Sequence, residues 1–362
     1  MLRCDALVVG GGPAGSTCAR VLTRAGWNVV VLDRARFPRD KVCAGWVTPG
    51  VFALLDLDPA EYRATGLTIQ DITGFRSSVI GQPAVDTRYS AVVSYAIRRC
   101  EFDDFLLRRS GARVIGSTPL TSLARQGDVW IANNEISAPI VVGAGGHFCP
   151  VARQLRGGAD VVRPVVAKEA EYTVEDNGST VAGDTPELFF CRDLEGYGWC
   201  VRKGRYLNIG LGRRDHGDLN PHVEDFIGFL ERRGLARRAS LVRWCGHAYL
   251  ASGTGPRPLV GDGVLVAGDA AGLAYPESGE GIKPAVESGR LAAETLLEAG
   301  GRVRLDDLRP YDRALRRRYP ATSSTPAALS GVVRSLGRVL LRSRAFTRHV
   351  LIDRWFLHQA GL

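Results

Sequence analysis

Close to the N-terminus, three glycines have the spacing of a phosphate-binding turn. An apolar strand, Asp5 to Val9, runs into G-G-G-P-A-G, which extends from Gly10 to Gly15. In this pattern Gly10 permits a sharp turn, Gly12 leaves the backbone open to a pyrophosphate, and Gly15 lets the next helix pack on the strand. The N–H groups at the start of that helix would face the phosphates at its positive end. The spacing therefore predicts a dinucleotide site.

A carboxylate stands where such a site needs one. A second apolar strand, Asn28 to Leu32, ends at Asp33, eighteen residues after Gly15. An acidic side chain at this position accepts hydrogen bonds from both hydroxyls of a ribose, which disfavours a 2′-phosphate. This context makes the glycine pattern much more specific than a glycine-rich turn alone.

The same combination of strand and turn returns far along the chain. The apolar stretch from Gly263 to Ala267 ends in Gly268-Asp269, and a long helix is expected from Gly281 to Ala299. Asp269 could bind the hydroxyls of a sugar alcohol. The N–H groups at the helix start could face a ring carbonyl on which negative charge gathers.

The elements that must position these residues alternate between strands and helices. The pattern predicts an α/β fold: a Rossmann-like nucleotide-binding domain, an inserted antiparallel β-sheet substrate domain and a C-terminal helical segment. The expected nucleotide-binding domain is discontinuous and comprises residues 1–80, 97–160 and 260–300. The expected substrate domain comprises 81–96 and 161–259, with strands at 161–166, 188–191, 197–201 and 206–211. Residues 301–362 form the expected basic helical segment.

Bulk properties exclude several classes of protein. The 362 residues contain no apolar run near the ~20 residues that cross a bilayer, and no signal peptide fits before the first strand. The eight cysteines show neither a C-x-x-C pair nor zinc spacing, so no metal site is expected. We expect a reduced, cytoplasmic protein without disulfides.

Positive charge is concentrated at the C-terminus. Residues 301–362 contain thirteen Arg and four Asp without Lys or Glu, and so carry the whole net charge of +9. Arg334, Arg338 and Arg342 recur along one helical stripe next to apolar residues. Two interpretations remain open: a terminal helix packed on its own domain, or a basic amphipathic helix that makes peripheral contact with an anionic membrane or an acidic partner. No nucleic-acid recognition motif accompanies the arginines.

Together the two turns resemble the FAD-dependent oxidoreductases of the p-hydroxybenzoate hydroxylase type, and within them the geranylgeranyl reductase group. The resemblance covers roughly residues 4–300. It implies FAD as the cofactor, with the pyrophosphate on the first turn and the ribose at Asp33. The cofactor-binding residues that it implies are Gly10, Gly12, Ala14, Gly15, Asp33, Arg34, Ala44, Gly45, Arg99, Leu123, Asp269, Gly281 and Ile282.

The resemblance also implies a catalytic thiol and a substrate surface. Reductases of this group carry a Cys near the flavin at the position of Cys43, and a thiol there could donate a proton. A turn residue packed under the ring is the alternative. Tyr197 and Trp199 alternate on an expected strand, so both would lie on one face and could hold a small hydrophobic substrate. Ordinary core packing is the alternative for this pair.

These features predict reduction of carbon–carbon double bonds in a hydrophobic, isoprenoid-like substrate. Two alternatives remain: a monooxygenase acting on an aromatic or polyketide substrate, and a non-catalytic flavin-binding or membrane-recruited partner protein. Gly145 stands where flavin hydroxylases of this type usually carry Asp, which argues against hydroxylase-like use of a nicotinamide. The electron donor would be NAD(P)H, bound transiently because a second complete glycine turn is missing, or a protein.

Overall fold

A computed structural model describes residues 1–158, 164–174, 179–214, 218–238, 243–253, 257–320 and 330–358, with side chains of the last range from 335 onward. These residues form two compact units, each described by itself below. Unit 1 comprises 1–40, 100–163 and 249–323, and unit 2 comprises 41–99, 164–248 and 324–362. Among the described helices, none combines the length and apolar character needed to cross a membrane.

Unit 1 is built on a six-stranded sheet with the order β19-β20-β13-β2-β3-β9. Its strands are β2 (Ala6–Val9), β3 (Val29–Leu32), β9 (Arg113–Ile115), β13 (Ile140–Gly143), β19 (Val260–Gly261) and β20 (Val264–Val266). All neighbours pair in parallel except β19, which is antiparallel to β20. Because β2, β3 and β13 are buried along their whole length, helices must cover both faces of this sheet.

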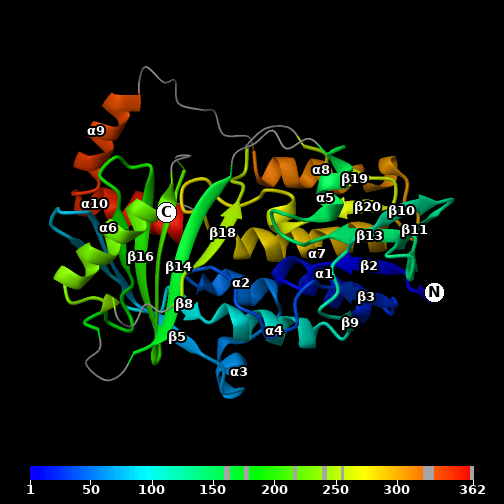
Figure 1. Cartoon of the computed structure of the whole chain (residues 1–362), viewed down its shortest axis with the longest axis horizontal. Helices are drawn as coiled ribbons and strands as arrows, with labels where there is room; N and C mark the ends of the chain where they lie inside the picture. Colours follow the sequence, from blue (N-terminus) through cyan, green and yellow to red (C-terminus); the bar gives the residue numbers. More distant parts are fainter. Residues whose placement is uncertain are drawn as a thin grey trace. The chain divides into compact units, whose positions relative to one another are not determined.

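Helices complete the core of unit 1. They are α1 (Pro13–Arg24), α4 (Arg99–Arg109), α5 (Pro150–Leu155), the 3₁₀ turn η2 (Gly268–Ala270), α7 (Ile282–Glu298) and α8 (Leu305–Arg318). Figure 1 shows α1 and α7 running side by side, and a methyl group added at Gly289 of α7 would lie 2.1 Å from the Ala14 carbonyl oxygen of α1. Glycine at this crossing lets the two helices approach within backbone contact.

A small second sheet belongs to the same unit. Its order is β1-β12-β11-β10, formed by β1 (Leu2–Arg3), β10 (Leu123–Gln126), β11 (Val129–Ala132) and β12 (Ile136–Ala138). Strands β10, β11 and β12 form an antiparallel meander, and β1 pairs in parallel with β12.

Unit 2 is built on a seven-stranded sheet with the order β18-β14-β17-β16-β15-β6-β7. Its strands are β6 (Gly74–Val79), β7 (Val85–Arg88), β14 (Val165–Thr173), β15 (Glu187–Phe190), β16 (Gly196–Lys203), β17 (Tyr206–Arg213) and β18 (Cys245–Tyr249). The antiparallel run β15-β16-β17 confirms the meander predicted from the sequence. Strand β14 continues to Thr173, beyond the predicted end at 166, and residues 161–163 of that prediction lie outside the described residues.

The two faces of the seven-stranded sheet are covered by different elements. Phe226 and Leu230 of α6 (Leu219–Arg232) share one buried cluster with Ile209 and Leu211 of β17. Trp199 and Val201, on the opposite face, share another cluster with Leu351, Ile352 and Phe356 of the C-terminal π-helical segment η4 (Thr347–Phe356). The remaining elements of unit 2 are α2 (Pro49–Leu54), α3 (Pro59–Ala64), α9 (Ser330–Leu340), α10 (Arg344–Phe346) and the sheet β4-β8-β5 (Trp46–Val47, Ser94–Ile97, Ile69–Ile72).

The units differ from the domain boundaries expected from sequence. Residues 41–80, expected in the nucleotide-binding domain, fall in unit 2, because β6 pairs in parallel with β15 and β4 and β5 pair with β8. Residues 301–362 do not form one segment. Leu308 and Tyr311 of α8 are buried in the core of unit 1, whereas η4 packs in unit 2. The first departure arises from strand pairing, and the second from helix packing in two different cores.

Candidate functional site

The glycine turn of unit 1 has the geometry that its spacing predicts. Gly10 has φ +111°, and a methyl group there would lie 2.4 Å from the Ala144 carbonyl oxygen. At Gly15, a methyl group would lie 1.9 Å from the Gly10 carbonyl oxygen. Gly12 is the N-cap of α1 and supplies no side-chain cap. The N–H groups of the first helical turn are therefore left for an anionic ligand.

A cation that the sequence analysis did not assign lies beside this turn. A methyl group added at Gly12 would meet Nη2 of Arg39 at 3.5 Å. The same nitrogen lies 3.2 Å from Oδ2 of the fully buried Asp103, and the guanidinium lies 4.7 Å from the centre of the Phe37 ring. Because these contacts hold the positive charge next to the open face of Gly12, Arg39 is a candidate ligand for a pyrophosphate.

Asp33 is fixed by the backbone around the turn. Its Oδ2 accepts a hydrogen bond from the Gly11 N–H at 2.7 Å, and its Oδ1 accepts one from the Ala35 N–H at 2.8 Å. The side chain is buried at the end of β3, while neighbouring Arg34 is exposed. Both oxygens keep further lone pairs for ribose hydroxyls. Asp33 is therefore held in place to bind a ribose, as predicted, whereas the structure gives no such fixed position to the exposed Arg34.

The second predicted turn lies at the same edge of the same sheet. Strand β20 neighbours β13, which neighbours β2, so Gly268 and the first turn both follow carboxyl ends of parallel strands. A methyl group at Gly268 would lie 3.1 Å from the Cβ of Ala14, and one at Gly281 would lie 3.1 Å from Oδ1 of Asp269. Gly281 caps α7 without a side-chain hydrogen bond, directly before Ile282. The fold therefore brings together turns that are more than 250 residues apart in the sequence.

Two further residues predicted to contact the cofactor, Leu123 and Arg99, lie outside both turns. Leu123 begins β10 in the small sheet, half-buried, and its carbonyl accepts a hydrogen bond from Nε2 of Gln154 at 3.1 Å. Arg99 is buried at the first position of α4 and falls in unit 2. Their contacts with a cofactor remain predictions.

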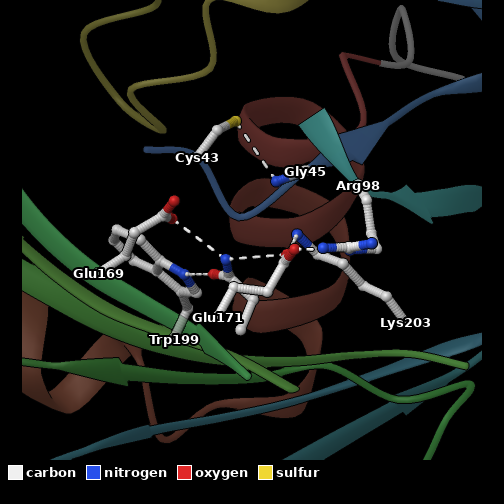
Figure 2. A network of polar contacts seen from close by, with 8 residues as sticks. Cys43, Gly45, Arg98, Glu169, Glu171, Trp199 and Lys203 are labelled. Atoms are coloured by element: carbon white, nitrogen blue, oxygen red, sulfur yellow. Dashed lines mark hydrogen bonds and ion pairs between the residues drawn. The ribbon is translucent and has the colours of Figure 1, made fainter. Parts of the chain in front are cut away.

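In unit 2 the main polar feature is a buried cluster formed by Glu169, Glu171, Asn208, Lys203 and Arg98. Figure 2 shows this cluster with the Cys43 turn beside it. Nζ of the fully buried Lys203 lies 2.8 Å from Oε2 of Glu171, and Nε of Arg98 lies 2.8 Å from Oε1. The amide nitrogen of Asn208 donates to Glu169 at 3.2 Å and to Glu171 at 3.4 Å.

The orientation of Asn208 follows from its partner. Nε1 of Trp199, which can only donate, lies 2.7 Å from Oδ1 of Asn208. The amide oxygen must therefore face Trp199, and the amide NH₂ must face the two carboxylates. Asn208 therefore connects Trp199 of β16 to Glu169 and Glu171 through hydrogen bonds.

The pKa values of the two carboxyl groups in the cluster are shifted in opposite directions. Burial raises the pKa of Glu169 to about 7, against the weaker opposing influence of Lys203 and hydrogen bonds from Asn208 and the Cys43 backbone. Burial also acts to raise the pKa of Glu171, but Lys203 and Arg98 together hold it below its ordinary value. Environments that separate the pKa values of neighbouring carboxylates are frequent at functional sites.

The Cys43 turn lies directly on this cluster. The Gly45 N–H donates to Sγ of Cys43 at 3.3 Å, and the Gly45 carbonyl accepts from the Ile97 N–H at 2.7 Å. Gly45 has φ +68°, and a methyl group there would lie 2.0 Å from the Ile97 carbonyl oxygen and 2.6 Å from Nζ of Lys203. The turn therefore requires glycine at 45, and Ala44 packs partly against the apolar cluster beyond it.

Tyr197 and Trp199 share one face of β16, as predicted, with ring centres 6.1 Å apart. They belong to an aromatic wall with Trp46, Phe75 and Phe356. Phe356 lies 5.6 Å from Tyr197 and 5.2 Å from Trp46, which stacks on Phe75 at 4.6 Å. Trp46, Phe75, Trp199 and Phe356 are buried in one core cluster, as the core-packing alternative expects, and Tyr197 is half-buried; Trp46 follows the Cys43 turn directly in sequence.

The carboxylates of the cluster were missed at the level of sequence. One signal was available: Glu169 and Glu171 alternate within V-V-A-K-E-A-E-Y-T, a pattern that places two charges on one face of a strand. Lys203 gives no such signal, because its burial depends on pairing with β14 through β17. Among the residues that the structure describes, no group of three His, Cys, Asp or Glu is placed to hold a metal ion.

Comparison with known proteins agrees with this geometry. Residues 5–99 match the family model described as FAD dependent oxidoreductase. The chain is 31% identical over 332 residues to a menaquinone reductase of Mycolicibacterium smegmatis, covering 83% of this chain and 77% of the relative. It is 28% identical over 338 residues to a digeranylgeranylglycerophospholipid reductase of Methanothrix thermoacetophila, covering 87% and 83%.

A solved structure shows the same fold. The geranylgeranyl bacteriochlorophyll reductase-like protein of Thermoplasma acidophilum superposes with a TM-score of 0.72 at 20% identity, covering 100% of this chain and 93% of that one. The chain therefore belongs to the FAD-dependent oxidoreductases, in their geranylgeranyl reductase-like group. This confirms the resemblance, the fold class and FAD as the cofactor type.

Proposed function

We propose that this protein reduces carbon–carbon double bonds in a hydrophobic, isoprenoid-like substrate. The observation that carries the proposal is the aromatic wall of unit 2, which continues through Trp46 into the Cys43 turn. Trp46, Phe75, Trp199 and Phe356 are buried in this cluster, and Tyr197 is its half-buried member, which a hydrophobic substrate could contact. An apolar lining with few polar groups is typical of sites for such ligands.

The names of the relatives support the substrate class. They refer to menaquinone and to a digeranylgeranyl lipid, and both compounds carry isoprenoid chains. The present chain shares most of its length with these proteins. We therefore infer a lipid with an isoprenoid chain as the substrate.

The roles of the chain's own residues follow from their placement. Bound flavin supplies hydride chemistry. The turn from Gly10 to Gly15, with Arg39 and Asp33, would hold the pyrophosphate and ribose, and Asp269 with the start of α7 would hold the other half. Cys43 would deliver a proton from Sγ to the substrate carbon that does not receive hydride, because reducing an alkene adds one of each.

Turnover tests the proposal. The protein is reduced under anaerobic conditions and incubated with a geranylgeranyl lipid or a menaquinone. Mass spectrometry then measures the masses of the products. Alkene reduction adds about two mass units. A product heavier by about sixteen units that forms only with O₂ would contradict the proposal and favour the monooxygenase alternative. Bound FAD that no donor or substrate turns over would favour the non-catalytic alternative.

A matched pair of variants tests the thiol in the same assay. We expect Cys43→Ser to lower kcat by about 100-fold, the usual contribution of a general acid. Cys245→Ser, in a half-buried cysteine of β18, should leave turnover near the wild-type value. Anaerobic titration with NADH and NADPH then identifies the donor. If neither bleaches the flavin, a protein donor is indicated.

We further propose that α9 makes peripheral contact with an anionic membrane. Leu336 and Val339 are 56% and 64% exposed, which is unusual for large apolar side chains. Arg338 and Arg342 are exposed close by. The side chain of Arg334, the third predicted member of this stripe, lies outside the described residues. A helix with exposed leucine, valine and arginines fits a membrane surface from which a lipid substrate would be taken.

A further inference from the structure

The Cys43 turn lies against the end of a lysine side chain that the proposed reaction does not use. This residue, Lys203, is the last of strand β16 and is fully buried. A methyl group added at Gly45 would lie 2.6 Å from Nζ and 3.1 Å from Cε of the lysine. The open face of Gly45 therefore packs directly on the end of the lysine side chain. Figure 2 shows both residues together with Cys43.

One carboxylate holds the two groups that contact Gly45. Nζ of Lys203 lies 2.8 Å from Oε2 of Glu171, and Nε of Arg98 lies 2.8 Å from Oε1 of the same residue. Arg98 directly follows Ile97, whose N–H donates to the Gly45 carbonyl at 2.7 Å. The ion pairs of Glu171 therefore fix the lysine on one side of the turn and the end of β8 on the other.

The conformation of Gly45 in turn determines where the thiol is held. Gly45 has φ +68°, and its N–H donates to Sγ of Cys43 at 3.3 Å. A rotation of the Gly45 backbone would move this N–H away from the thiol. Because alternate residues of a strand share a face, Lys203 also lies on the face of β16 that carries Tyr197 and Trp199.

We propose that Lys203, held by Glu171, is a positioning residue for Cys43: it supports Gly45 in the conformation that directs the N–H to Sγ. A buried ion pair adds little net stability over apolar side chains of the same volume, so stability alone does not account for a lysine here. The catalytic consequence rests on the proposed function, in which the thiol donates a proton. The support of the turn is tested without any substrate.

Hydrogen exchange of the purified full chain, followed by mass spectrometry, tests the support of the turn. Lys203→Met keeps a long side chain but removes the charge that Glu171 holds, and Glu171 retains Arg98 as its counter-charge. We expect the peptide covering residues 41–47 to exchange at least about ten-fold faster in this variant, because the turn then opens more often. Glu171→Gln removes the same ion pair from the other side and should give the same change.

Arg213→Met is the matched control. Arg213 is buried on the neighbouring strand β17 and pairs with Asp193 at 2.6 Å, so this variant also removes a buried cation from an ion pair. Arg213 lies opposite Gly196, the first residue of β16, whereas Lys203 is the last. Exchange of residues 41–47 should therefore keep its wild-type rate. Unchanged exchange in Lys203→Met, or equally faster exchange in both methionine variants, would overturn the proposal.

Turnover of a geranylgeranyl lipid in a double-mutant cycle shows whether Lys203 acts through the thiol. Lys203→Met should lower kcat by about ten-fold and leave KM within about two-fold, because a misplaced catalytic group slows the chemical step. In Cys43→Ser, where no thiol is left to position, adding Lys203→Met should lower kcat by less than about two-fold. Losses that multiply would give the lysine a role independent of Cys43 and refute the proposal. If the protein does not reduce the lipid, the proposed function fails, and hydrogen exchange still decides whether Lys203 supports the turn.

Discussion

Several single residues of unit 1 lie where two backbones touch. Gly15 faces the Gly10 carbonyl oxygen, and Gly289 faces the Ala14 carbonyl oxygen, at distances where no side chain fits. Glycine at the first position is required by the phosphate turn. Glycine at the second lets α7 pack against α1, so both halves of the proposed FAD site depend on a glycine where no side chain would fit.

We therefore expect Gly289→Ala to destabilise the protein by about 3 kcal/mol, the upper end of the range for overpacking. Gly228→Ala is the matched control, because Gly228 also lies inside a helix but faces only the flexible end of Arg232. Relief of the glycine penalty should stabilise that variant by up to about 1 kcal/mol. Urea unfolding measures both, and equal effects of the two variants would contradict this account of the α1–α7 contact.

At the scale of elements, the C-terminal arginines divide among helices with different surroundings. Helix α8 buries Leu308, Tyr311 and Leu315 in the core of unit 1, and η4 buries Leu351 and Ile352 in unit 2. Deleting all of residues 301–362 would therefore remove parts of two cores. Point substitutions at Arg338 of α9 and at Arg342 in the turn that follows it test membrane contact without that damage.

We expect Arg338→Glu together with Arg342→Glu to reduce binding to vesicles of phosphatidylcholine and phosphatidylglycerol by at least about ten-fold, since each basic residue contributes about 1 kcal/mol near an anionic surface. Arg313→Glu with Arg317→Glu, both exposed on α8, makes the same change in net charge and is the control. Co-sedimentation measures both. An equal loss for the two pairs would show that net charge alone, without α9, determines binding.

At the scale of the whole molecule, the proposed FAD site of unit 1 is assembled from three separate stretches of chain. Strands β2, β13 and β20 are neighbours in one sheet although they lie far apart in sequence. A cofactor that bridges their ends should stabilise the fold, because it binds the assembled sheet and not the unfolded chain.

Saturating FAD should thus raise the free energy of unfolding by about 2.7 kcal/mol at a hundred times its Kd, seen as a higher midpoint in thermal unfolding. FMN lacks the adenosine half that Asp33 would hold, so at the same concentration it should give a smaller shift. Identical shifts with FAD and FMN would contradict the role assigned to Asp33 and the first turn.

The sequence by itself determined the local parts of this protein. The turn at Gly10–Gly15, the carboxylate at Asp33 and the pairing of Tyr197 with Trp199 on one strand face all follow from spacing within a few residues. Short-range patterns fix such features because backbone sterics and strand periodicity act locally. The FAD-dependent class followed from the two turns at opposite ends of the chain.

Only the tertiary structure decided what lies around Cys43. The cluster needs Glu169, Lys203 and Arg98 from three separate stretches of the chain, and the register of β14, β17 and β16 brings Glu169 and Lys203 onto one face. The place of residues 41–80 depends likewise on β6 joining β15 across more than 100 residues. Burial and charge are properties of such long-range pairings, and these are set by the packing of the whole chain rather than by any one stretch of it.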